Sequence, residues 1–93
     1  MVIGLLSLKL RIPESESLKG KRQILLGLKT RIRNRLNVSI SEIDHQDKWQ
    51  LATLGVASVG NDRAGVNRTL SHTVEVVQRE RGVELMDYEL EFL

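Results

Sequence analysis

Two stretches of the chain carry apolar residues at helical spacing, and strand-like segments flank both; this order constrains the fold more than any other feature. The first stretch predicts a helix from about Leu18 to Asn34 or Leu36, because its apolar residues recur at intervals of seven, three, four and four. The second begins after a capping Asn61 or Asp62 and is closed by Gly82. The apolar stripes consist of Leu18, Leu25, Leu28, Ile32 and Leu36, and of Val66, Leu70, Val74 and Val77.

Four segments have the alternation or the apolar character of strands. The first is ended by Pro13, and a cap at Ser15 or Ser17 then starts the first helix, with Asn37 as its C-terminal cap. Residues 44–48 are too few for a crossover, so the two middle strands form a hairpin. The predicted strands are Val2–Ile12, Val38–Ile43, Trp49–Val59 and Val83–Leu93.

The order β-α-β-β-α-β predicts an α+β, ferredoxin-like fold of one domain, residues 1–93. Right-handed crossovers give an antiparallel sheet of order 4-1-3-2 with both helices on one face. In the last strand the even positions, Met86 to Phe92, should face the helices. Its acids should then lie on the open face and pair with Lys9 and Arg11.

Composition excludes several classes of function. The chain has no cysteine, so disulfide scaffolds, thiolate metal sites and cysteine nucleophiles are excluded. No apolar run approaches the ~20 residues of a membrane helix, and Met1–Ile12 lacks the pattern of a signal peptide. We expect a cytoplasmic protein with no membrane partner and no cofactor.

The charge distribution is the main functional hint. Seven basic residues and no acidic one lie between Ser17 and Ser41, whereas the last ten residues carry four acids and no base. Helical spacing places Arg22, Lys29 and Arg33 on one flank of the apolar stripe and Arg31 and Arg35 on the other. Such a helix can contact RNA phosphates. The alternatives are a solvated face or pairing with acids of another element. The candidate residues are Lys19, Lys21, Arg22, Lys29, Arg31, Arg33 and Arg35.

Aromatic residues do not support base stacking on the sheet. RNA-binding domains of this topology place aromatics on the first and third strands, where this chain offers Ser7, Lys9, Gly55 and Ala57. Any RNA contact should therefore be led by shape or backbone. For Trp49, closing one end of the core is favoured over an exposed contact.

The sequence contains no convincing catalytic or metal site. Asp44, His45 and Asp47 share one loop without a second histidine nearby, which is a poor metal site. His72 falls on the polar side of the second helix, and residues 60–62 form a capping turn rather than a phosphate loop. We expect no catalytic residue and no bound metal.

A small apolar patch is predicted on the open face of the sheet. Uncovered sheet faces of this kind serve as dimer surfaces, although scattered exposed apolar residues are also ordinary. The patch consists of Ile3, Leu5, Ala57 and Val59, the candidate residues for homodimer formation.

Five strings in the same order resemble the YlxP-like family of small bacterial proteins of unknown function. They cover the chain almost from end to end, with Gly20 and Leu36 standing where Glu and Phe are typical. The resemblance implies a ferredoxin-like fold without established catalytic residues. It also implies an RNA- or ribosome-associated role, because genes of the family lie beside those for translation initiation and ribosome maturation. The strings are Ser17–Arg22, Arg31–Ser39, Gln46–Gln50, Leu54–Val56 and Asn61–Arg63.

The leading hypothesis is therefore a non-enzymatic module that binds structured RNA or a ribosomal particle through its first helix. The alternative is a self-associating module that uses the open sheet face.

Overall fold

A computed structural model describes all 93 residues and has the predicted order of elements. The four strands form one antiparallel sheet of order β2-β3-β1-β4, which is the predicted order read from the other edge. The elements are β1 (Val2–Arg11), α1 (Leu18–Arg35), β2 (Ser39–Asp44), β3 (Leu51–Gly60), α2 (Arg63–Gln78) and β4 (Glu84–Phe92).

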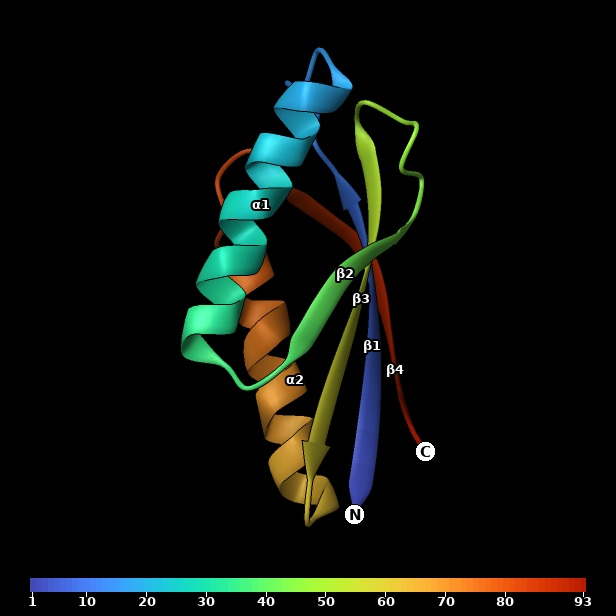
Figure 1. Cartoon of the computed structure of the whole chain (residues 1–93), viewed down its shortest axis with the longest axis vertical. Coiled ribbons are helices and arrows are strands. Elements are labelled where there is room, and N and C mark those ends of the chain that lie inside the picture. Colours follow the sequence, from blue (N-terminus) through green and yellow to red (C-terminus); the bar gives the residue numbers. More distant parts are fainter.

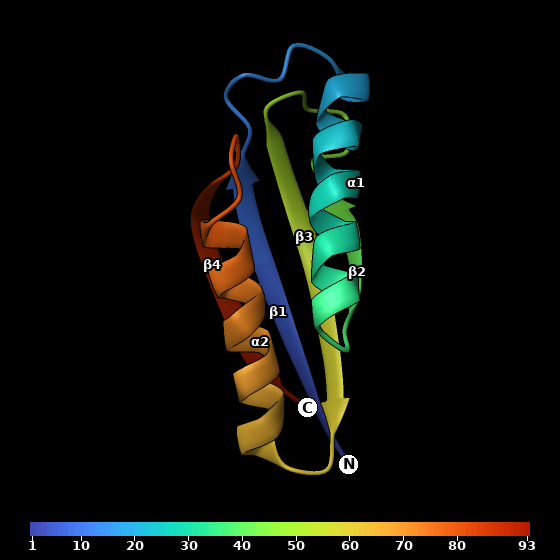
Figure 2. The same cartoon turned by 90° about the vertical axis from the view of Figure 1, so that its left-hand side faces the viewer.

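Both helices cover one face of the sheet, and the other face is open (Figure 1). Figure 2 shows α1 over the β2 side and α2 over the β1 and β4 side. Neither helix combines the length and apolar character needed to span a membrane. The chain ends lie near each other at one end of the sheet, where the Leu93 N–H donates to the Ile3 carbonyl (2.8 Å).

The core is a single layer of 16 buried apolar residues between sheet and helices. Strand β1 contributes Leu6, Leu8 and Leu10, which alternate with residues of the open face as predicted. Helix α2 lies unusually close to β1 at Gly4. A β-carbon there would lie 2.5 Å from Val66 Cγ1 and 2.7 Å from Leu70 Cδ1, so only glycine permits this approach.

Side-chain caps start both helices where the sequence indicates. The Ser17 hydroxyl accepts from the Gly20 N–H (2.9 Å), and the Asp62 carboxylate accepts from the Gly65 N–H (2.6 Å). The predicted C-terminal caps are wrong. α1 ends at Arg35 with Leu36, not Asn37, as its cap, and α2 ends at Gln78 with Arg79 as its cap. Gly82 instead adopts φ 78° in the turn before β4.

The alternation predicted for β4 fails at its first half because of a bulge. Pairing with β1 shifts register between Lys9 and Leu10, so that Leu85 rather than Met86 faces the core. Met86 and Tyr88 are exposed at this sheet edge, whereas Leu90 and Phe92 pack against the core as predicted.

The charge pairing predicted for the open face is also absent. Lys9 lies opposite Asp87 in register, and Arg11 opposite Glu84. Neither pair forms an ion pair, since the structure contains only Lys21–Glu42 and Arg31–Glu80.

The hairpin between β2 and β3 has a longer loop than the sequence predicts. β3 begins at Leu51, so Trp49 belongs to the loop and is 56% exposed. The prediction that Trp49 closes the core is therefore wrong.

Candidate nucleic-acid interface

The cations of α1 have three different environments, and the first belongs to Lys21. Its side chain is fully buried, in line with the apolar stripe that continues through Leu25 and Leu28. Its amino group donates to a Glu42 carboxylate oxygen (2.8 Å) and to carbonyl oxygens of the hairpin. Those carbonyls belong to His45 (2.8 Å), Gln46 (3.4 Å) and Leu51 (3.1 Å).

Lys21 is therefore wrong as a predicted nucleic-acid contact. An ammonium group has three donors and no acceptor, and its burial is tolerated only with a charged partner and further oxygen atoms. Glu42 and the hairpin carbonyls supply both. Lys21 instead connects the first turn of α1 to the loop between β2 and β3.

The second environment is the flank of α1 that faces the β2 edge of the sheet. Arg22 and Arg33 are exposed there and Lys29 is half-buried, with Lys19 exposed beside them. Arg33 donates to the Ile40 carbonyl of β2 (2.8 Å), which identifies the side of the helix on which this flank lies. None of these four side chains forms an ion pair. We call them the outer stripe: Lys19, Arg22, Lys29 and Arg33.

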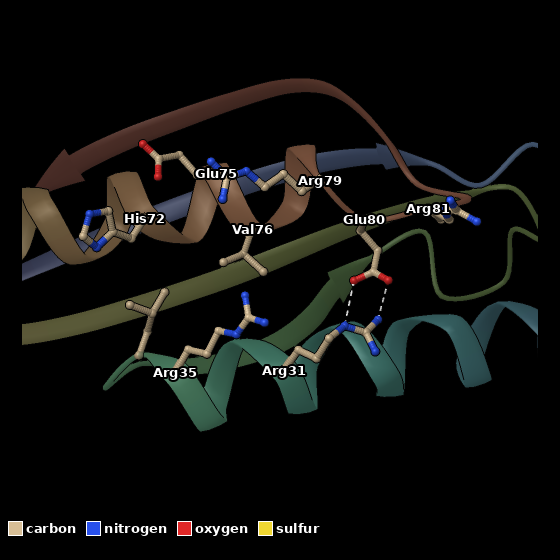
Figure 3. Close-up of a pocket in the computed structure, with 9 residues that line it drawn as sticks. Arg31, Arg35, His72, Glu75, Val76, Arg79, Glu80 and Arg81 are labelled. Atoms are coloured by element: carbon tan, nitrogen blue, oxygen red, sulfur yellow. Dashed lines mark hydrogen bonds and ion pairs between the residues drawn. The ribbon is translucent and has the colours of Figure 1, made fainter.

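The third environment is a cleft of about 590 Å³ between the two helices. Arg31 donates through Nε to Glu80 (2.9 Å) and through a second nitrogen to the other carboxylate oxygen, which closes one part of the cleft (Figure 3). Arg35 extends from α1 towards Val76 of α2. The charged and polar lining consists of Arg31, Arg35, His72, Glu75, Arg79, Glu80 and Arg81.

Arg79 and Arg81 were missed as candidate residues by sequence reasoning. They lie directly after the end of α2, on either side of Glu80, and look like ordinary surface charge. Only the packing of α2 beside α1 brings them to the same cleft as Arg31 and Arg35. No signal within either helix alone indicates this arrangement.

Folding leaves most of the positive charge of α1 without a carboxylate partner. Two of the seven cations are paired, Lys21 with Glu42 and Arg31 with Glu80. Lys19, Arg22, Lys29, Arg33 and Arg35 are not. The acids at the chain end lie on β4, where Asp87, Glu89 and Glu91 share the open face with the alternate residues of β1. The basic and acidic segments therefore lie on opposite layers of the protein.

The open face of the sheet brings the four predicted self-association residues together. Ile3 lies opposite Val59 and Leu5 opposite Ala57 in adjacent strands. A hollow of about 770 Å³ adjoins them, floored by Ser7, Gly55 and Ala57 and bordered by Ile43. Glu89 and Glu91 form its rim on the β4 side.

No aromatic side chain lies on the strands of that face. Tyr88 and Phe92 pair with Leu8 and Gly4, whose side of the sheet faces the helices, and Trp49 lies in the hairpin loop. The expectation that the sheet lacks a stacking platform for RNA bases agrees with this arrangement.

Asp44 at the end of β2 and the loop residues His45 and Asp47 do not form a metal site. No group of three or more His, Asp or Glu side chains in the structure could hold a metal ion. The His45 ring shares a hydrogen bond between Nδ1 and Thr53 Oγ1 (2.9 Å), and its carbonyl accepts from Lys21. His72 lies on the cleft between the helices and is exposed.

Comparison with known proteins assigns the chain to a family. A family model described as a protein of unknown function (DUF503) matches residues 3–90, and the chain belongs to this family. It is 37% identical over 76 residues to the uncharacterized protein YlxP of Bacillus subtilis (strain 168), covering 82% of this chain and 83% of that protein. The resemblance to YlxP-like proteins is thereby confirmed.

The architecture also has a counterpart among solved structures. The de novo designed protein Foldit4 matches with a TM-score of 0.56 at 10% sequence identity, covering 98% of this chain and 96% of that one. At this identity the similarity shows the fold alone.

Proposed function

We propose that this protein is a non-enzymatic module that binds structured RNA or a ribosomal particle through the layer formed by its helices. The observation that carries the proposal is the set of five α1 cations that folding leaves unpaired. Pairing with acids of another element is one of the two alternative explanations for this charge, beside a solvated face, and it applies only to Lys21 and Arg31. The remaining cations are available to phosphate groups, which dominate affinity for nucleic acids.

The shape of the protein supports contact through α1 rather than through the sheet. An 18-residue helix is about 27 Å long. The outer stripe runs along most of that length, so its cations can contact several successive phosphates of an RNA backbone. The open face instead carries three acids on β4, which repel phosphates. A-form RNA is recognised largely by its shape and backbone, and this agrees with the absence of aromatics on the sheet.

The test is binding to purified ribosomal RNA as a function of salt concentration. The variant Arg22→Gln/Lys29→Gln removes two cations of the outer stripe, and Lys9→Gln/Arg11→Gln removes two exposed cations of the open face as a matched control. We expect the first variant to weaken binding and to reduce the slope of log K against log salt by about 2. Equal binding by the two variants would exclude the outer stripe.

A second candidate function is self-association through the open sheet face, with a second copy of this chain as the partner. Along β1 this face is apolar at Ile3 and Leu5 and basic at Lys9 and Arg11, and the acids Glu89 and Glu91 lie beside the apolar end. Asp87 lies opposite Lys9, so the acids of β4 extend along the whole face. A two-fold axis perpendicular to the strands would place Lys9 and Arg11 of one copy over the end of the other copy that carries Glu91. Isologous interfaces require this kind of self-complementarity.

Sedimentation separates the two candidates. If the open face is the interface, Leu5→Glu converts a dimer into a monomer without affecting RNA affinity, and salt weakens the dimer. A dissociation constant above about 100 µM is weak for a specific interface. A wild-type protein that sediments as a monomer at that concentration would therefore exclude this function.

A further inference from the structure

The hairpin loop presents the only tryptophan of the chain to solvent. Trp49 is 56% exposed, although an indole ring offers one of the largest gains from burial of any side chain. The loop contributes no apolar side chain of its own to the core, since the core residues nearest in sequence are Ile40 and Ala52. The exposed part of this ring is therefore not covered by any other part of the chain.

The backbone on both sides of Trp49 is held in place. The Ile12 N–H donates to the Gln50 carbonyl (2.8 Å), and the Gln50 side-chain amide donates to the Pro13 carbonyl (3.1 Å). On the other side the Lys48 N–H donates to the His45 carbonyl (3.0 Å), which also accepts from the buried Lys21 amine. A contact made by Trp49 would thus require little further ordering of the loop, which favours binding.

The same lysine places the loop beside the basic end of α1. Lys21 lies in the first turn of α1 and contacts the loop at His45 and Gln46. Lys19 and Arg22, its neighbours in that turn, are exposed. The loop that carries the exposed Trp49 is therefore joined, through Lys21, to the turn of α1 in which the outer stripe begins. Aromatic rings next to positively charged surfaces are the usual means by which proteins hold unpaired nucleotides.

We infer that Trp49 stacks on an unpaired base of an RNA whose phosphates lie along the outer stripe. The inference rests on the proposed function and adds to it the class of RNA: a paired stem with an adjoining single-stranded loop or bulge. The stacking ring then lies in the loop between β2 and β3, and not on the sheet face that other RNA-binding domains with this topology use.

Fluorescence of Trp49 reports the contact directly, because the chain contains no other tryptophan. The probes are an RNA hairpin with an unpaired purine loop and the fully paired duplex of the same stem. We expect the hairpin to quench the indole emission and the duplex to leave it nearly unchanged. Trp49→Ala should weaken hairpin binding about 5- to 100-fold, the usual loss for one stacked base, whereas Trp49→Phe should retain most of the affinity.

Two controls separate the inference from the proposed function. Circular dichroism should show the same fold and melting temperature for Trp49→Ala, since an exposed side chain is removed. Binding of RNA that depends on salt and on Arg22 and Lys29, without quenching and with unchanged affinity in Trp49→Ala, would overturn the inference and leave the proposed function intact. Failure of the wild-type protein to bind the hairpin, the duplex or ribosomal RNA would overturn both.

Discussion

The buried amino group of Lys21 lies 2.8 Å from a carboxylate oxygen of Glu42, so that an ion pair joins α1 to β2 inside the protein. The same amino group donates to three carbonyls around the hairpin loop. Two of the strings that are shared with YlxP-like proteins, Ser17–Arg22 and Gln46–Gln50, therefore meet at this side chain. Part of what makes the sequence recognisable is therefore a structural contact. Lys19, Arg22 and Trp49 are among the residues of those two strings that remain exposed and can be examined for function.

Removal of the Lys21 amine should destabilise the fold strongly. Lys21→Met keeps the aliphatic length of the side chain but leaves the Glu42 carboxylate and the hairpin carbonyls without their donor. Breaking a buried pair in this way typically costs about 3–5 kcal/mol. Urea denaturation measures the change in the free energy of unfolding. Lys19→Met, an exposed position in the same turn, is the matched control and should change it by less than about 0.5 kcal/mol. Equal stabilities of the two variants would contradict the role assigned to Lys21.

The second ion pair of the protein should contribute far less. Arg31 is paired with Glu80 across the cleft, but its side chain is 47% exposed. Exposed pairs are screened by water and contribute about 0.2–1 kcal/mol. A double-mutant cycle with Arg31→Gln and Glu80→Gln should give a coupling energy in that range, falling as salt increases. A coupling energy that is large and insensitive to salt would mean that the pair is effectively buried.

The close approach of α2 to β1 makes Gly4 intolerant of a side chain. Gly4→Ala would place its methyl group 2.5 Å from Val66 and 2.7 Å from Leu70, and over-packing of this kind costs about 1–3 kcal/mol. Thermal melting should show the loss. Gly27→Ala serves as the control, because its nearest neighbour is the flexible end of Arg31 at 3.5 Å. Alanine there should stabilise α1 by up to about 1 kcal/mol. A stable Gly4→Ala variant would show that α2 can move away from β1.

The two flanks of α1 should differ in their contribution to RNA binding. Arg35→Gln/Arg79→Gln removes two arginines of the cleft, where Glu75 and Glu80 partly offset the positive charge. Arg22→Gln/Lys29→Gln removes two cations of the outer stripe, which contains no acid. We expect the stripe variant to lose more affinity for ribosomal RNA in a filter-binding assay at low salt. A greater loss in the cleft variant would move the interface to the α2 side of the helix.

Several features of the site follow from sequence and others do not. Helical spacing correctly separated Arg22, Lys29 and Arg33 from Arg31 and Arg35, because a regular helix determines which residues share a side. It did not distinguish Lys21 from Lys19, although Lys21 precedes Leu25 by four residues and so continues the apolar stripe. A lysine on a buried stripe is a local signal that was available. The pairing of Lys21 with Glu42 involves residues 21 positions apart and depends on how α1 packs over the hairpin.

The order of the elements, and with it the order of the strands, was determined by the sequence alone. Each segment must bury one face with its own period, and the connections are too short for other arrangements. The tertiary structure decided the bulge that turns Leu85 inward, the ion pairs that remove Lys21 and Arg31 from the set of free cations, and the exposure of Trp49. Periodicity describes how one element meets the core, whereas the environment of an individual charge or ring depends on neighbours distant in the chain. That dependence is why the basic helix could be predicted from the sequence, but the residues of it that remain available to a partner could not.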